Sequence, residues 1–102
     1  MSFKGKTALV TGSTSGIGLA VATRFASLGV NVVLNGFGDA AEIEKIRADL
    51  AAAHGVEVLY DGADMSKPAE IAAMVEKAVA RFGCVDILVN NAGIQFVSPV
   101  DE

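Results

Sequence analysis

The sequence predicts an α/β fold built on a doubly wound parallel sheet, and three observations support this prediction. Four short apolar runs, at residues 7–10, 30–34, 56–60 and 85–89, alternate with three stretches of helical periodicity. Apolar residues make up 52% of the 102 residues, which suits strands buried on both faces. The β-α-β-α-β-α-β pattern with right-handed crossovers predicts parallel strands, and a doubly wound sheet of this kind has the strand order 3-2-1-4.

Each helical stretch has its own start or stop signal. The first ends before Gly29, a residue suited to the end of a helix. The second begins at Asp39 with a carboxylate three residues later, which resembles a capping box, and ends at Gly55. The third has Pro68 in its first turn and ends at Gly83. The expected buried stripes are Ile17, Ala20, Val21, Phe25 and Leu28, then Ile43, Ile46 and Leu50, then Ile71, Met74, Val75, Ala78, Val79 and Phe82.

Composition limits the classes of function. The chain is long enough for one domain at most, and its net charge of −4 with no basic stripe argues against nucleic-acid binding. Cys84 is the only cysteine, so we expect a reducing compartment. No apolar run approaches the length of a signal-peptide core or a membrane span. We therefore expect a cytoplasmic protein with a small-molecule ligand, no membrane partner and, since His54 has no second ligand nearby, no metal site.

The most informative segment is the glycine-rich turn T-G-S-T-S-G-I-G at residues 11–18, between the first apolar run and the first helical stretch. Its glycines permit a tight turn and a close approach of the backbone to a phosphate, while the helix start presents free N–H groups. The hydroxyls of residues 13–15 can add hydrogen bonds to phosphate or ribose. An ordinary Gly/Ser-rich loop is the alternative, but the strand before the turn and the helix after it favour dinucleotide binding. The expected cofactor contacts in this turn are Gly12, Thr14, Ser15, Gly16, Ile17 and Gly18.

Three further polar or glycine-rich clusters follow the other apolar runs, at residues 35–38, 63–65 and 90–93. The carboxyl ends of parallel strands meet at one edge of the sheet, so all these clusters should gather there. The strand order reverses between the first and fourth strands, and ligands of open α/β sheets bind at that position. Periodicity alone would scatter such clusters over both edges, so their coincidence favours a binding site.

The residues of two clusters suit particular parts of a nucleotide. The carboxylate of Asp64 can accept a hydrogen bond from an adenine amino group, while the Met65 N–H donates to a ring nitrogen. The alternative is that Asp64 caps the next helix or faces water. Ala92 and Gly93 lack bulk, so a ribose can pack on their backbone, although a plain tight turn is the alternative. Asn91 is ambiguous because asparagine also bonds turn backbones locally.

Residues 11–18 and 86–93 together resemble the amino-terminal half of the short-chain dehydrogenases/reductases. The spacing G-x-x-x-G-x-G and the sequence D-I-L-V-N-N-A-G are that family's form, and the resemblance covers essentially all 102 residues. It implies a Rossmann-type fold and an oxidoreductase that uses a nicotinamide cofactor. Residues 33–45, 59–64 and 91–95 resemble the members that interconvert 3-hydroxybutyrate and acetoacetate with NAD.

The resemblance also implies roles for individual residues. Phe37 would lie beside the adenosine ribose, and Gln95 would reach the substrate carboxylate with its neutral amide donor, the alternative being a solvated loop residue. The other implied cofactor contacts are Asp64 and Met65 at the adenine, Ala63 before them in the chain, and Asn91, Ala92 and Gly93 at the middle of the cofactor. A homo-oligomer, a tetramer, is implied for the full-length protein.

Charges near the expected ribose site favour NAD over NADP. Ser15 stands where NADP-using relatives often carry Arg or Lys, and residues 35–38 contain no cation for a 2′-phosphate. The acidic residue that usually binds the ribose 2′-OH is missing from the end of the second strand, where Gly36 or Phe37 lies. Asn35 is a candidate to replace it.

The family's proton-transfer residues are a Tyr, a Lys four residues later and an upstream Ser. Tyr60, the only tyrosine, lies in a predicted strand and is followed at that spacing by Asp64, so we assign it to packing and expect no catalytic residue here. Residues 1–102 are thus expected to form the dinucleotide-binding half of a Rossmann-type domain, incomplete and inactive alone. Two alternatives stay open, namely another short-chain reductase with a 3-oxoacyl, sugar or steroid substrate, and a non-catalytic dinucleotide-binding module.

Overall fold

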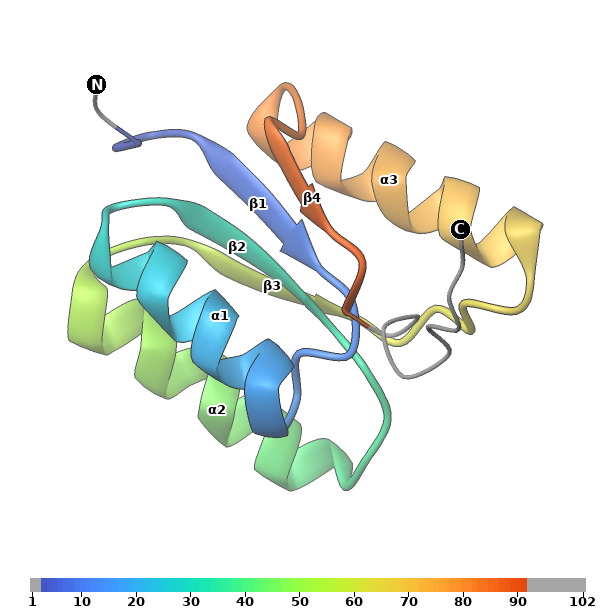
Figure 1. The fold of residues 1–102 in the computed structure, drawn as a ribbon, viewed down its shortest axis with the longest axis horizontal. Helices are drawn as coiled ribbons and strands as arrows, with labels where there is room; N and C mark the ends of the chain where they lie inside the picture. The colour runs from blue at the N-terminus through green and yellow to red at the C-terminus, as the bar shows by residue number, and fades with distance from the viewer. Residues whose placement is uncertain (1–2, 92–102) are drawn as a thin grey trace, which may run out of the picture.

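A computed structural model describes residues 3–91, in which four strands alternate with three helices (Figure 1). The predicted contacts Ala92, Gly93 and Gln95 lie outside the described residues. The strands are β1 (Thr7–Val10), β2 (Asn31–Asn35), β3 (Val58–Asp61) and β4 (Ile87–Val89). The helices are α1 (Gly16–Ser27), α2 (Ala40–His54) and α3 (Pro68–Phe82). The predicted alternation of strands and helices is confirmed.

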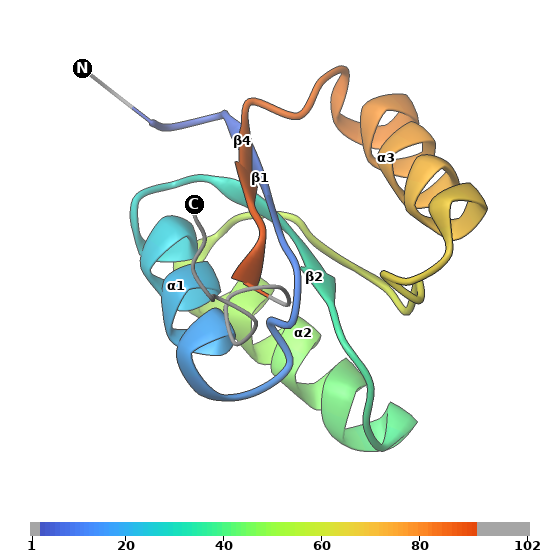
Figure 2. The ribbon, with the colours of Figure 1, turned by 45° about the vertical axis from the view of Figure 1, so that its right-hand side comes forward.

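The strands form a parallel sheet in the order β3-β2-β1-β4, as predicted. Helices α1 and α2 cover one face of this sheet, and α3 covers the other (Figures 1 and 2). The connections through α1 and α2 run on one face and the connection from β3 through α3 to β4 runs on the other, so the strand order reverses between β1 and β4. The loops after the strands therefore converge on a single edge, which is the edge where open α/β sheets bind ligands.

Burial on both faces explains the apolar runs of the central strands. Val10, Val32 and Leu34 pack under α1 and α2, whereas Leu9 and Val33 pack under α3. Successive side chains of a strand point to opposite faces, so a strand covered on both sides needs apolar residues at every position. These five side chains are at most 1% exposed.

The buried face of α1 is formed by its small residues Gly18, Ala22 and Ala26. The prediction that large apolar residues form the buried face of α1 is wrong in part. Small residues at the contact let the helix approach the sheet closely, and the larger apolar residues then lie at the sides of the contact or in solvent. Ile17 in the first turn is 75% exposed, and Leu28 at the end of the helix is 38% exposed. The exposed members of the predicted stripe are Ile17, Ala20 and Leu28.

The other two helices follow their predicted stripes more closely. Ile43 and Leu50 of α2 are buried, and Met74 of α3 is buried with Ala78. Val75 and Val79 of α3, also expected in the stripe, are 36% and 41% exposed. Among residues 3–91, α3 is the one helix on its face of the sheet, so this flank has no second helix to contact (Figure 2).

The predicted helix ends are confirmed. Gly29, Gly55 and Gly83 adopt positive φ angles of 83°, 65° and 91°, which side chains disfavour. The Asp39 carboxylate accepts a hydrogen bond from the Glu42 N–H at 3.0 Å and caps α2. Strands β3 and β4 each begin two residues later than predicted, and β2 begins one residue later.

Candidate functional site

A pocket of about 590 Å³ opens at the carboxyl edge of the sheet, within the size range of small-molecule sites. The loops after all four strands contribute to its wall. The predicted cofactor contacts that line this pocket are Gly12, Thr14, Ser15, Phe37, Ala63, Asp64, Met65 and Asn91. Asn35, Gly36 and Ser66 also line it. The structure therefore brings together clusters that are far apart in the sequence.

The N-terminus of α1 directly follows the part of the turn that lines the pocket. Ser15 is the N-cap residue, and its side chain makes no capping hydrogen bond. The first intrahelical bond runs from the Leu19 N–H to the Ser15 carbonyl at 3.2 Å. Gly16, Ile17 and Gly18 therefore have no intrahelical acceptor for their N–H groups. These donors and the positive end of the helix dipole suit an anion such as a phosphate.

Two glycines of the turn are required for different reasons. A Cβ atom at Gly18 would overlap the Gly12 carbonyl oxygen and lie 2.7 Å from Asn91 Nδ2. That amide donates to the Gly12 carbonyl at 3.1 Å, so Asn91 holds the turn from the end of β4. Gly16 has open space around it but a φ of +60°, so its conformation and not its volume favours glycine.

The hydroxyl groups of the turn do not all face the pocket. Ser13 is fully buried, and its Oγ donates to the Val10 carbonyl at 2.6 Å and accepts from the Asn35 N–H at 2.9 Å. The prediction that Ser13 bonds phosphate or ribose is wrong, because its hydroxyl joins β1 to β2. Thr14 does line the pocket, but its hydroxyl donates to the Phe37 carbonyl at 3.2 Å and fixes the loop after β2.

Asn35 is buried at the end of β2, with 2% of its surface exposed. Its Oδ1 accepts from the Gly12 N–H at 3.3 Å, and its Nδ2 donates to the carbonyls of Asp61 and Ala63, each at 3.0 Å. The expectation that Asn35 replaces the missing ribose-binding acid is wrong, because its amide is already bound to three backbone groups. Sequence reasoning missed this role, since an asparagine after a strand does not reveal which backbone groups it meets.

The structure explains why no acidic side chain follows Asn35. A Cβ atom at Gly36 would overlap Thr14 Oγ1, so a larger residue there would displace the Thr14 side chain. The Gly36 carbonyl also accepts a hydrogen bond from the Tyr60 hydroxyl. Tyr60 packs against the core beneath α1 and α2, as expected, but sequence reasoning missed this polar contact. Phe37, the next residue, is 71% exposed at the rim of the pocket.

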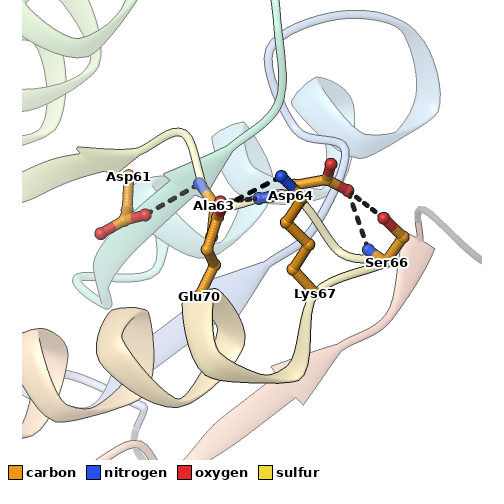
Figure 3. Close-up of polar contacts among 6 residues, drawn as sticks. All are labelled: Asp61, Ala63, Asp64, Ser66, Lys67 and Glu70. Atoms are coloured by element: carbon orange, nitrogen blue, oxygen red, sulfur yellow. Dashed lines mark hydrogen bonds and ion pairs between the residues drawn. The ribbon is translucent and has the colours of Figure 1, made fainter.

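Asp64 lies in the loop between β3 and α3 (Figure 3). Its Oδ1 accepts hydrogen bonds from the Ser66 hydroxyl at 2.7 Å and the Ser66 N–H at 2.9 Å. These two bonds, followed by the charge of Lys67, lower the pKa of Asp64 and keep it a carboxylate. The alternative that Asp64 caps α3 is wrong, because the N-cap residue is Lys67 and no side chain caps the helix. One oxygen of Asp64 instead fixes the loop before α3, while the other points away from Ser66 (Figure 3).

Glu70 supports the same loop from the first turn of α3. Its Oε1 accepts from the Asp64 N–H at 2.8 Å, and its Oε2 lies 3.8 Å from Lys67 Nζ (Figure 3). Asp61 contributes a further bond, from the Ala63 N–H to its Oδ1 at 2.9 Å. Sequence reasoning missed Glu70, although an acidic residue in the first turn of a helix was the available signal.

At the opposite end of β4, Asp86 bridges β4 and β1. Its Oδ2 accepts from the Thr7 N–H at 2.9 Å, and its own N–H donates to the Thr7 carbonyl at 3.0 Å. The first of these bonds, with a smaller contribution from the Cys84 thiol, lowers the pKa of Asp86. This residue lies far from the pocket and stabilises the sheet.

Within residues 3–91, no three His, Cys, Asp or Glu side chains gather as they would to hold a metal ion. No helix in the same part of the chain is both long enough and apolar enough to cross a membrane.

The parallel sheet, its reversal of strand order and the glycine-rich start of α1 are typical of dinucleotide-binding α/β proteins. The family model for short chain dehydrogenases matches residues 6–102. The chain therefore belongs to the short-chain dehydrogenase family, and the predicted resemblance and fold class are both confirmed.

Individual relatives agree with this family. The chain is 53% identical over 97 residues to D-beta-hydroxybutyrate dehydrogenase of Rhizobium meliloti, covering 95% of this chain and 38% of the relative. It is 56% identical over 99 residues to the Cupriavidus necator enzyme of the same name, covering 96% and 37%. The solved L-sorbose reductase of Gluconobacter frateurii, complexed with NADPH and L-sorbose, matches with a TM-score of 0.83 and 42% identity, covering 91% and 35%. The chain thus spans little more than a third of these relatives' length.

Proposed function

We propose that this chain is the cofactor-binding half of an NAD-dependent D-3-hydroxybutyrate dehydrogenase, which interconverts 3-hydroxybutyrate and acetoacetate. The observation that carries the proposal is the pocket at the carboxyl edge, where the glycine-rich turn leads directly into the open N-terminus of α1. The identity of 53–56% to two D-beta-hydroxybutyrate dehydrogenases supports the choice of substrate.

The chain's own residues suit the parts of a dinucleotide in order along the carboxyl edge of the sheet, from the start of α1 to the loop after β3. The pyrophosphate is expected at the N–H groups of Gly16, Ile17 and Gly18, where the helix dipole favours negative charge. The adenosine ribose would pack between the turn and Phe37. The adenine would lie against Ala63 and the loop that follows it, with Asp64 accepting from its amino group and the Met65 N–H donating to a ring nitrogen.

The electrostatics of the pocket support NAD over NADP. Asp64 is the one charged side chain among the described residues that line it, so a 2′-phosphate would meet no Lys or Arg there. The crowding of Gly36 against Thr14 accounts for the missing acidic residue. A 2′-OH would therefore be held by backbone groups beside Phe37. When bound, NAD supplies the hydride acceptor, while the protein orients it and the substrate.

The remaining roles belong to the same proposal. Asn91 fixes the turn through the Gly12 carbonyl, so the nicotinamide end would pass beside it and over Ala92 and Gly93. Gln95 would donate its amide to the substrate carboxylate, and the proton-transfer Ser, Tyr and Lys would come from the rest of the enzyme. We further propose a cytoplasmic homo-oligomer, a tetramer, for the full-length protein.

A titration of the chain with NAD, NADP and 5′-AMP tests the cofactor assignment, with binding followed by the amide NMR signals of residues 12–18 and 63–66. We expect NAD to bind more tightly than NADP and to shift both groups of signals. Tighter binding of NADP, or NAD signals confined to the opposite edge of the sheet, would contradict the assignment.

The substrate is tested in the protein that contains this chain, by following NAD reduction with D-3-hydroxybutyrate. L-Sorbose and a 3-oxoacyl thioester with reduced cofactor serve as competing substrates, because both an L-sorbose reductase and a 3-oxoacyl reductase are 42% identical to this chain. Faster turnover of either competitor would favour another short-chain reductase. Cofactor binding with no turnover of any of them would favour a non-catalytic module.

A further inference from the structure

The two ends of the proposed cofactor site are built by loops that leave different strands. The phosphate-binding turn follows β1, and the adenine-binding loop follows β3. Strand β2 lies between them, and its last residue is Asn35. The relative position of the two loops therefore depends on what lies at the end of β2.

Backbone pairing alone does not connect these loops. The pairing of β1 with β2 ends at Val10 and Leu34, and that of β2 with β3 ends at Asn35 and Asp61. Gly12 and Ala63, which line the pocket, each lie two residues beyond their strand. At this point the chains leave the sheet, and strand pairing no longer fixes their spacing.

The side-chain amide of Asn35 connects the two loops. It accepts from the Gly12 N–H on one side and donates to the Asp61 and Ala63 carbonyls on the other. Both amide hydrogens are thereby used, which is the full donor capacity of an asparagine side chain. The backbone of Asn35 is fixed as well, since its carbonyl accepts from the Ser13 N–H at 2.6 Å and its N–H donates to Ser13 Oγ. With 2% of its surface exposed, the residue has little freedom to rearrange.

We propose that Asn35 is a positioning residue that sets the distance between the phosphate-binding turn and the adenine-binding loop. The inference rests on the proposed function, because it assigns these loops to the two halves of a dinucleotide. Two sites held at a fixed distance bind a two-part ligand far more tightly than they bind either part of it alone. The second contact then forms within a complex that already exists. A preformed spacing also removes the cost of ordering the loops on binding.

The test is made in the protein that contains this chain, and it compares NAD with its separate parts, adenosine and inorganic pyrophosphate, on the unmodified chain and on Asn35→Leu. Leucine has nearly the same size but no polar atom, so Gly12, Asp61 and Ala63 lose their common partner. We expect NAD affinity to fall about tenfold or more, while the affinities for adenosine and pyrophosphate each change less than about threefold. Each affinity is corrected for the folded fraction, measured by circular dichroism in the same buffer.

Val58→Ala is the matched control. Val58 is 3% exposed in the core at the other end of β3, so its truncation destabilises the fold without removing a bond from either loop. Its corrected NAD affinity should equal that of the unmodified chain. A loss as large as that of Asn35→Leu would show that lowered stability alone explains the effect and would overturn the inference.

Two further measurements apply if Asn35→Leu does not fold. Asn35→Ser leaves room for water to bond the two carbonyls but cannot reach both loops, so it should show the same selective loss of NAD affinity. In the unmodified chain, the Asn35 side-chain NH₂ signals should exchange with solvent much more slowly than those of an exposed asparagine. Rapid exchange would overturn the inference.

The remaining outcomes separate this inference from the proposed function. If the unmodified chain binds NAD and Asn35→Leu binds it equally well, the inference fails and the function stands. If adenosine and pyrophosphate lose as much affinity as NAD, Asn35 is a general scaffold residue and the inference again fails. If the unmodified chain binds no NAD, the proposed function fails and the inference falls with it.

Discussion

Replacing Gly18 with alanine should destabilise this protein, although the same change in most helices is stabilising. Alanine in a helix interior is favoured over glycine by about 1 kcal/mol. Here the new methyl group would overlap the Gly12 carbonyl oxygen and lie 2.7 Å from Asn91 Nδ2. Overpacking of this kind costs about 1–3 kcal/mol.

The hydrogen bond from Asn91 to the Gly12 carbonyl would also be disturbed, at a cost of about 1 kcal/mol. The favourable helix term offsets only part of these costs, so we expect a net loss of about 1–3 kcal/mol in the free energy of unfolding. Urea titration followed by circular dichroism measures this loss directly.

Gly16→Ala separates a steric effect at Gly18 from a general need for glycine in this turn. A Cβ atom at Gly16 meets nothing within 4 Å, but its φ is +60°. The expected cost there is that of the left-handed backbone alone, about 1 kcal/mol. A Gly18→Ala protein at least as stable as the unmodified chain would refute the reasoning, because it would mean that α1 and the turn can move apart freely.

Two further predictions concern carboxylates that bind backbone N–H groups. Glu70→Ala removes the acceptor of the Asp64 N–H, so we expect the free energy of unfolding, measured by urea titration, to fall by about 1 kcal/mol and 5′-AMP binding to weaken. Glu70→Gln keeps an acceptor and should largely restore both. Unchanged 5′-AMP affinity in the alanine variant would contradict this role. The bond from the Thr7 N–H lowers the pKa of Asp86 in the folded state below its value in the unfolded state. The ionised Asp86 side chain therefore stabilises the fold above the unfolded-state pKa, and this stabilisation is lost as the pH falls through the folded-state pKa. Asp86→Asn keeps an acceptor for Thr7 but does not titrate, so urea midpoints measured across acidic pH should fall less steeply than in the unmodified chain, and equally steep curves would exclude this contribution.

The architecture could be predicted because its signals are local. Alternating apolar runs and helical periodicity identify the elements, glycines after each helix mark the ends, and a doubly wound sheet of this kind has the strand order 3-2-1-4. The same logic places the four loop clusters at one edge. The error in α1 arose because periodicity treats large apolar residues as the buried ones, whereas close contact with the sheet selected Gly18, Ala22 and Ala26.

The individual roles of polar residues at the site could not be predicted in this way. Ser13 and Thr14 are neighbours in one hydroxyl-rich turn, yet the first is buried between strands and the second lines the pocket. Glu70 appears in the sequence as one of many charged residues on helices, but in three dimensions it holds the Asp64 N–H. Such roles depend on partners from distant segments, which no local pattern encodes.

By itself, the sequence determined the family, the order of strands and helices, and the edge at which the glycine-rich turn meets the other loops. These features follow from residue periodicity and chain connectivity, which act over short stretches of sequence. Only the tertiary structure decided that Asn35 faces backbone groups and not a ribose, and that Thr14 occupies the space an acidic side chain would need at Gly36. Both outcomes depend on close packing and hydrogen-bond satisfaction among β1, β2 and β3, which the folded chain brings together.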